Sequence, residues 1–329
     1  MVRISIVIAA HNQAPELQRN LPVLLAQDFA PGFEVIVVDE SSTDETGDVL
    51  KKLGSEHPNL YATFIPASSH YVSRRKLAIT LGIKAAKGEW VIITEADCHP
   101  EDSAWLNTMF QKMTDEADVV LGYTGYDHDA KPFRRYLRLY SWWRQQQRPY
   151  SCDGANVAIR KQAFMERNGF LKNLRQLRGE FDFLVNESEP ERIAVCKASE
   201  AHIRQEAPSN RQWKARQLFY MDTRRHLQRT FIPRLCFALT QTAIHLSYWV
   251  ILAALAVAVT QQNGVMAAIA GGLLLLIVWR IFTVWRMVRA YGEQIALWQL
   301  PLLDLGIAWH YIGYWLRYQC SDKKDFERA

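Results

Sequence analysis

Residues 91–100 read VIITEADCHP, an apolar run typical of a buried strand that ends in two carboxylates, Glu95 and Asp97. A single residue, Ala96, separates the two acids. Two like charges held this close repel each other unless a positive group lies between them. The stretch therefore predicts a site at the end of a strand where something cationic is bound.

The chain before residue 125 alternates between strand-like and helix-like segments. Strands are expected at Ile4–Ala10, Glu34–Val38, Tyr61–Ile65, Trp90–Thr94 and Asp118–Leu121. Helices are expected at Pro15–Ala26, after a capping box at Ser42–Glu45, and at Ser73–Ala86. Strands joined by helices in this way predict an α/β fold, with a mostly parallel sheet that is covered by helices on both faces.

In such a sheet, ligands bind beyond the carboxyl ends of the strands. The polar residues at these ends are His11, Asn12, Asp39, Glu40, Glu95 and Asp97. No glycine-rich loop follows the first strand, which disfavours both a dinucleotide fold and a Walker-type phosphate loop. Bound phosphates would therefore need another positive charge. Mg²⁺ or Mn²⁺ held by Glu95 and Asp97 would supply it, because these ions accept one or two carboxylates together with phosphate and water.

The region from Leu235 to Trp279 contains no Asp, Glu, Lys or Arg. It splits at the polar turn Gln261–Gly264 into two apolar segments of about 20 residues, the length that a helix needs to cross a bilayer. Arginines flank the outer ends of the pair but not the turn, so the positive-inside rule predicts a hairpin with both ends in the cytoplasm. The alternative, a hairpin buried in a soluble core, is disfavoured because the segments are apolar on every face.

A third apolar segment, Ile295–Leu316, contains Pro301, Asp304 and His310. A charge in the middle of a bilayer is unfavourable. The segment could cross with Asp304 facing protein, or it could lie in the interface, where its tryptophans would be well placed. An interfacial or re-entrant helix is the preferred interpretation.

Two segments combine basic and aromatic residues, Lys131–Arg148 and Arg211–Arg234. Such a mixture is compatible with nucleic-acid binding. The second segment leads directly into the apolar hairpin, however, and is better explained as an amphipathic helix on an anionic lipid surface. The first could also lie there, could shape an acceptor site, or could be a domain helix with a solvated arginine face. No nucleic-acid partner is expected.

Four stretches occur in an order that resembles the inverting family 2 glycosyltransferases of the GT-A fold: ISIVIAAHN, VIVVDESSTDET, KAAKGEWVIITEADCHPEDSAWL and GANVAIRKQAF. The resemblance covers residues 2–230. It implies that Asp39 contacts the base of a nucleotide and that Glu95-Ala96-Asp97 corresponds to the metal-binding Asp-x-Asp motif. Glu95 replaces the more common Asp, and Glu40 and Gln13 also depart from the family pattern.

The resemblance also implies a catalytic base in an acidic motif beyond the metal motif, and Gly179–Val185 is the only good match. Phe181 interrupts the usual acidic pair, so the base could be Glu180 or Asp182, with Asp182 preferred. These acids could instead simply stabilise a helix N-terminus. The remaining candidate residues are donor-binding Ala9, His11, Asn12, Asp39, Ser41, Arg75, Glu95, Ala96 and Asp97, and acceptor-binding Asp153 and Trp213.

These features together predict a membrane-anchored transferase that moves a sugar from a nucleotide-diphosphate sugar to a lipid-linked or growing glycan. We expect the catalytic domain to face the cytosol at the inner membrane. Alternatives are a transferase acting on polyprenyl phosphate and a non-catalytic scaffold for glycan assembly. The expected segments are a catalytic domain (1–207), a basic juxtamembrane helix (208–234), a transmembrane hairpin (235–284), a third membrane or interfacial helix (295–317) and a charged cytosolic tail (318–329).

Overall fold

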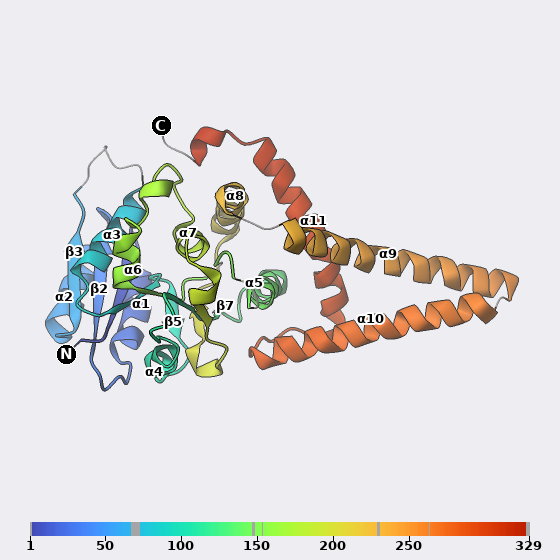
Figure 1. Ribbon diagram of the computed structural model, residues 1–329, viewed down its shortest axis with the longest axis horizontal. Coiled ribbons are helices and arrows are strands. Elements are labelled where there is room, and N and C mark those ends of the chain that lie inside the picture. The colour runs from blue at the N-terminus through green and yellow to red at the C-terminus, as the bar shows by residue number, and fades with distance from the viewer. Residues whose placement is uncertain are drawn as a thin grey trace.

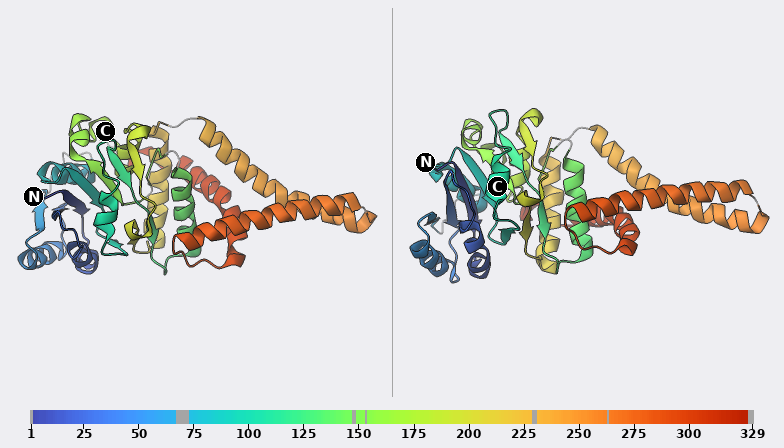
Figure 2. Two further views of the ribbon diagram at one scale, coloured as in Figure 1. Left: turned by 60° about the horizontal axis from the view of Figure 1, so that its bottom comes forward. Right: turned by 90° about the horizontal axis from the view of Figure 1, so that it is seen from below.

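The computed structural model describes residues 2–66, 73–146, 149–152, 154–228, 231–262 and 264–326. Residues 2–228 form an α/β domain, from which a long helical hairpin projects (Figures 1 and 2). A further helix then leads the chain back to the domain (Figure 1).

The main sheet has seven strands in the order β3-β2-β1-β4-β8-β6-β9. They are β1 (Ile4–Ala10), β2 (Phe33–Asp39), β3 (Leu60–Phe64), β4 (Trp90–Thr94), β6 (Val119–Leu121), β8 (Val157–Arg160) and β9 (Ile193–Val195). Only the pairs made by β8 are antiparallel. The prediction of a mostly parallel sheet is confirmed, and its carboxyl-terminal edge is formed where β1, β2 and β4 end.

Helices cover both faces of this sheet, as the continuous apolar strands predicted. On one face, Ile4, Ile6 and Ile8 of β1 pack with helices α1 (Ala14–Leu25), α2 (Thr46–Glu56) and α4 (Trp105–Phe110). On the other face, Val7 and Ala9 pack with α3 (Arg74–Ala85) and α6 (Lys161–Glu166). Successive side chains of a strand point to opposite faces, so one apolar run supplies both cores.

The predicted capping box at Ser42–Glu45 is wrong. Helix α2 begins at Thr46, and its N-cap residue, Glu45, makes no capping hydrogen bond. Ser42 instead donates from both its backbone N and its Oγ to Asp39 Oδ1, at 2.9 and 2.5 Å. The carboxylate at the end of β2 thus closes the turn that follows it, and Ser42 is no longer available to cap the helix.

A second sheet lies beside the end of β4. It consists of β5 (Cys98–Pro100), β10 (Ile203–Gln205) and β7 (Thr124–Tyr126), with β10 in the middle. Strand β5 follows Asp97 directly and pairs antiparallel with β10, which brings Gln205 opposite Cys98. This pairing places a residue from far along the chain next to the acidic pair.

Helix α5 (Pro132–Gln145) is the first of the two basic aromatic segments, and its arginines Arg134, Arg135 and Arg138 are buried rather than solvated. Arg134 donates to the backbone oxygen of Pro208 and to Asn210 Oδ1, and Arg135 donates to the backbone oxygen of Gln294 at 2.7 Å. Buried guanidinium groups require such partners. Of the three alternatives considered for this segment, the domain helix with a solvated arginine face is therefore wrong as to its arginines.

Helix α8 (Asn210–His226) is the second basic segment, and it begins with a capping box formed by Ser209 and Gln212. Trp213 of this segment packs within protein: it is buried and contacts the rings of Tyr126 and His310. The adjacent helix α11 (Leu300–Gln319) takes the place that we had given to lipid.

Helices α9 (Phe231–Gln261) and α10 (Gly264–Ala290) form the projecting hairpin in Figure 1. Within the described residues, two helices are long and apolar enough to cross a membrane, Arg234–Gln261 and Gly264–Ala290. Helix α11 carries Asp304, which is buried and accepts hydrogen bonds from Arg280 of α10 and from Tyr136 of α5. The carboxylate thus faces protein, one of the two arrangements considered for this segment.

The chain after α10 returns to the α/β domain through Glu293, whose side chain is fully buried. Its Oε1 accepts from Arg204 Nη1 at 2.5 Å and from Tyr123 Oη at 2.9 Å. Arg204 precedes Gln205 on β10, so this ion pair links the end of the hairpin to the strand that reaches the acidic pair.

Replacing Glu293 with alanine is expected to lower the free energy of unfolding by about 3–5 kcal/mol, because it leaves the buried Arg204 without its main counter-ion. Thermal unfolding of the detergent-solubilised protein measures the effect. Glu101, a more exposed partner of Arg204, provides the matched control, and its alanine variant should lose no more than about 1 kcal/mol. Equal losses in both variants would contradict this account.

Candidate functional site

A cavity of about 940 Å³ opens beyond the carboxyl ends of β1, β2 and β4. Its walls come from the loop after β1, the start of α3, the start of helix α7 (Glu180–Asn186) and the exposed face of α8. It is lined by His11, Asn12, Glu40, Arg75, Glu95, Asp97, Arg138, Arg178, Glu180, Asp182, Gln205, Arg216 and Tyr220, among others. The sheet edge singled out from the sequence is thus the floor of a cavity.

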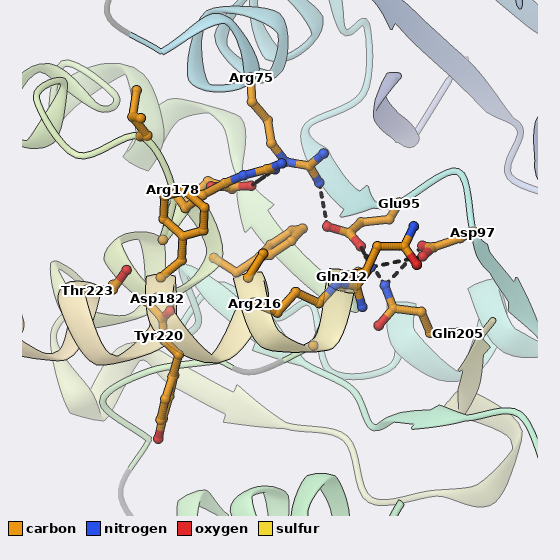
Figure 3. A pocket seen from close by; sticks show the side chains of 18 of the residues that line it. Arg75, Glu95, Asp97, Arg178, Asp182, Gln205, Gln212, Arg216, Tyr220 and Thr223 are labelled. Atoms are coloured by element: carbon orange, nitrogen blue, oxygen red, sulfur yellow. Dashed lines mark hydrogen bonds and ion pairs between the residues drawn. The ribbon is translucent and has the colours of Figure 1, made fainter. Parts of the chain in front are cut away.

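Glu95 and Asp97 both point into this cavity, where three side chains hold them (Figure 3). Gln205 Nε2 donates to Glu95 Oε2 at 2.5 Å and to Asp97 Oδ1 at 3.0 Å. Arg216 Nη2 lies 3.1 Å from Asp97 Oδ2 and 3.6 Å from Glu95 Oε2. Arg75 Nη2 lies 2.5 Å from Glu95 Oε1. The positive charge expected between the acids is supplied here by arginines.

The two acids of this pair respond differently to their surroundings. Burial opposes the ionisation of Glu95, but Arg75 and Arg216 outweigh it and hold the pKa of Glu95 at about 2. Burial and the neighbouring charge of Glu95 raise the pKa of Asp97. When two carboxylates share a site, one titrates at a higher pH than the other. Asp97 is therefore the member of the pair that acid protonates first.

Helix α7 brings the candidate bases to the same cavity. It starts after Gly179, which has a φ of +88° and lies so close to Thr223 that a Cβ atom would clash with that side chain. Glu180 is paired with Arg75, and Arg178 lies 3.8 Å from the same carboxylate. Asp182 accepts a hydrogen bond from the backbone N of Cys152 at 3.2 Å and lies at the far end of the cavity from Asp97 (Figure 3).

The loops after β1 and β2 interlock beside the cavity. His11 Nδ1 lies 3.1 Å from the backbone oxygen of Glu40, and Asn12 Oδ1 accepts from the backbone N of Thr43. Asn12 and Ser41 both have positive φ angles, 51° and 64°, which are uncommon for residues other than glycine. His11 and Asn12 line the cavity, whereas Asp39 and Ser41 lie behind it in the turn.

Of the remaining predicted site residues in the part of the chain that the structure describes, Ala9, Ala96 and Trp213 do not present side chains to the cavity. Ala9 and Ala96 are buried, so only their backbone is available to a ligand. Trp213 lies under α8 and is not among the residues that line the cavity, because its ring packs against Tyr126 and over Arg134. Asp153 is outside the described residues.

A model of glycosyl transferase family 2 matches residues 5–173, which is more than half of the chain. The chain belongs to glycosyl transferase family 2. Among solved structures, a mannosyltransferase from Pyrobaculum calidifontis, PcManGT, in complex with GDP-Man and Mn²⁺, has a TM-score of 0.54 at 18% identity over 96% of this chain and 83% of its own. This likeness supports the GT-A fold, which the resemblance implied and which is thereby confirmed.

Curated relatives in the family match shorter stretches. The dolichyl N-acetyl-α-D-glucosaminyl phosphate 3-β-D-2,3-diacetamido-2,3-dideoxy-β-D-glucuronosyltransferase of Methanococcus voltae is 30% identical over 127 residues, 37% of this chain and 38% of that protein. The UDP-Glc:α-D-GlcNAc-diphosphoundecaprenol β-1,3-glucosyltransferase WfaP of Escherichia coli is 28% identical over 97 residues, 30% of this chain and 36% of that protein. The chain thus spans less than half the length of these relatives.

The acidic pair of this family 2 chain fits a hard divalent cation. One nitrogen, Gln205 Nε2, is within hydrogen-bond distance of an oxygen of Glu95 and an oxygen of Asp97, so both oxygens face a common point. Within the described part of the chain, no group of three or more His, Cys, Asp or Glu side chains could hold a metal ion. Two carboxylates need phosphate and water to complete an octahedral shell, which suits Mg²⁺ or Mn²⁺ bound together with a diphosphate.

Three residues that contact the acidic pair or support its neighbours were not predicted from the sequence. Arg216 belongs to the segment that we assigned to lipid, and Arg138, which donates to Gln205 Oε1 at 3.0 Å, belongs to the buried helix α5. Gln205 lies in a three-residue strand with no recognisable motif. The spacing of basic residues along a helix does not indicate which of them face the site once the helix packs against the rest of the protein.

Proposed function

We propose that this protein is a membrane-anchored inverting glycosyltransferase that moves a sugar from a nucleotide-diphosphate sugar to a lipid-linked acceptor. The observation that carries the proposal is the arrangement of one cavity, with the Glu95–Asp97 pair at one end and Asp182 at the other. Membership of family 2 and the GT-A fold support the reaction class.

The chemistry follows from the charges in the cavity. A bound Mg²⁺ or Mn²⁺ would neutralise the diphosphate leaving group, and Glu95 and Asp97 are the residues that would hold it. Asp182 takes the proton of the acceptor hydroxyl. The oxygen of that hydroxyl bonds to the anomeric carbon of the donor sugar while the bond from this carbon to the diphosphate breaks. Asp182 is preferred over Glu180 because the Glu180 carboxylate is already paired with Arg75.

The hairpin supports the position of the enzyme at a membrane. Helices α9 and α10 expose large apolar side chains along their length, including Trp249, Val259, Leu275 and Trp279. Arginines at the outer ends of both helices favour a cytosolic location for the catalytic domain. A lipid-linked acceptor is consistent with this arrangement, because a membrane-embedded substrate would then lie close to the cavity. The names of the two curated relatives also specify lipid-linked acceptors.

The donor part of the proposal is tested by ligand-induced stabilisation of the full-length protein in detergent. UDP-, GDP- and TDP-sugars are each added with and without Mn²⁺, and the unfolding temperature is measured. We expect one donor class to raise the unfolding temperature only when Mn²⁺ is present. A ligand that binds only the native state, at a free concentration of about 100 times its Kd, raises the free energy of unfolding by about 2.7 kcal/mol. No shift with any donor plus Mn²⁺ would refute the proposal.

The acceptor part is tested with the donor identified in that way. Sugar transfer is compared between polyprenyl phosphate and a polyprenyl diphosphate that already bears a glycan. Transfer to the glycan-bearing lipid alone is the expected result. Transfer to polyprenyl phosphate alone would support the alternative acceptor class instead.

A further inference from the structure

Arg216 of α8 lies directly over the acidic pair (Figure 3). Its Nη2 is 3.1 Å from Asp97 Oδ2, while Gln205 bonds Asp97 Oδ1 and Glu95 Oε2 and Arg75 bonds Glu95 Oε1. Every oxygen of the two carboxylates therefore already has a donor from the protein. A cation bound between Glu95 Oε2 and Asp97 Oδ1 would take the place of Gln205 Nε2 and would lie beside the guanidinium of Arg216, whose positive charge opposes it.

The helix that carries Arg216 is fixed, but the side chain has room to move. Trp213 is buried beneath α8, Gln217 hydrogen-bonds to His310 at 2.9 Å, and Asp222 accepts from Tyr318 Oη at 2.7 Å. These contacts hold α8 against α11. The side chain of Arg216 is 35% exposed, compared with 13% for Arg75, and it borders the cavity. Arg216 is thus the more exposed of the two arginines, and moving it away from the carboxylates would also break its hydrogen bond with Tyr126.

The charges in the cavity favour movement of Arg216 when a metal and a diphosphate bind together. Without ligands, Arg216 and Arg75, which also pairs with Glu180, already offset the charges of Glu95 and Asp97, so a dication arriving alone would be repelled by two guanidinium groups. A dication that arrives with a diphosphate brings a compensating negative charge. The guanidinium released from Asp97 then faces a new anion within the same cavity, and charge-assisted hydrogen bonds of this kind are strong.

We propose that Arg216 is an internal competitor of the metal: it occupies Asp97 in the ligand-free protein and transfers to the diphosphate when metal and nucleotide bind together. The proposal rests on the donor site of the proposed function and adds a coupling to it. Because the coupling free energy is reciprocal, each ligand must strengthen the binding of the other by the same factor. Free Mn²⁺ therefore binds weakly, and the enzyme holds it firmly only beside a nucleotide diphosphate.

The test compares Mn²⁺ binding to wild-type protein and to Arg216→Gln by isothermal titration calorimetry, first alone and then with saturating UDP or GDP. Without nucleotide, Arg216→Gln should bind Mn²⁺ about tenfold more tightly, because a competing charged hydrogen bond is gone. With nucleotide this advantage should disappear, since the variant also lacks a diphosphate contact. Lys214→Gln removes the same charge from an exposed position two residues away and should match the wild type in both titrations.

Each outcome of the test has a separate meaning. If the wild type binds Mn²⁺ with UDP or GDP but Arg216→Gln shows no gain for Mn²⁺ alone, the competition is refuted and the donor site stands. If no nucleotide promotes Mn²⁺ binding to the wild type, the metal-dependent donor site fails and the competition fails with it. Arg216→Lys, which keeps the charge, should lie between the wild type and Arg216→Gln. Equal thermal unfolding of the variants shows that they are folded.

Discussion

Replacing Asp97 with alanine is expected to reduce sugar transfer by at least about 10³-fold. Asp97 presents one oxygen to the point that it shares with Glu95 and another to Arg216, so its loss removes a metal ligand and the anchor of Arg216. Glu95 alone remains to hold the cation. Single-turnover transfer from the identified nucleotide sugar, at saturating Mn²⁺, measures the effect.

The fold should tolerate this substitution, because Arg216 still lies beside Glu95 and one of two repelling charges has been removed. Asp48→Ala, at an exposed position on α2, is the control for loss of a carboxylate and should transfer sugar like the wild type. A cell that depends on the protein and grows normally with Asp97→Ala would instead favour the non-catalytic scaffold.

Replacing Asp182 with asparagine is expected to lower kcat by about 10²–10⁴-fold, the range associated with loss of a general base. Asparagine has the same shape and retains an oxygen that can accept the hydrogen bond from Cys152 N, so the start of α7 should stay in place. The affinity for the nucleotide sugar should change by less than about threefold, because Asp182 lies away from the acidic pair (Figure 3). Steady-state kinetics with varied donor separates the two effects.

The companion variant Glu180→Gln decides between the two candidate bases. Glu180 is paired with Arg75, which also holds Glu95, so its neutralisation should disturb donor binding more than kcat. The expected pattern is therefore a raised KM for the donor with a modest loss of kcat. A larger loss of kcat in Glu180→Gln than in Asp182→Asn would assign the base to Glu180.

The local pattern of the sequence was sufficient for much of the fold. Apolar runs at Ile4–Ala10 and Trp90–Thr94 are strands because β-branched residues buried on both faces favour a central parallel sheet, and the structure has both strands as predicted. The acidic pair after β4 was also recognisable, since it follows directly from a strand with a clear boundary, whereas the acids that start α7 were found through the family resemblance.

Other predictions failed because other side chains, some near and some distant in sequence, compete for the same groups. The capping box predicted at Ser42 does not form, because Ser42 donates its hydrogen bonds to Asp39. A solvated arginine face was one of three alternatives considered for α5, but other elements supply acceptors that bury three of its arginines; Arg138, for example, donates to Tyr126 Oη and Gln205 Oε1. Hydrophobic periodicity gives no information about such partners.

The sequence by itself determined the α/β alternation, the apolar hairpin and the position of two carboxylates at the end of a strand, because these depend on neighbours within a few residues. Only the tertiary structure decided what neutralises those carboxylates. Arg75, Gln205 and Arg216 reach them from three elements, across separations of up to 119 residues. A charge is neutralised by whatever lies near it in space, and proximity in space is set by the packing of the whole chain.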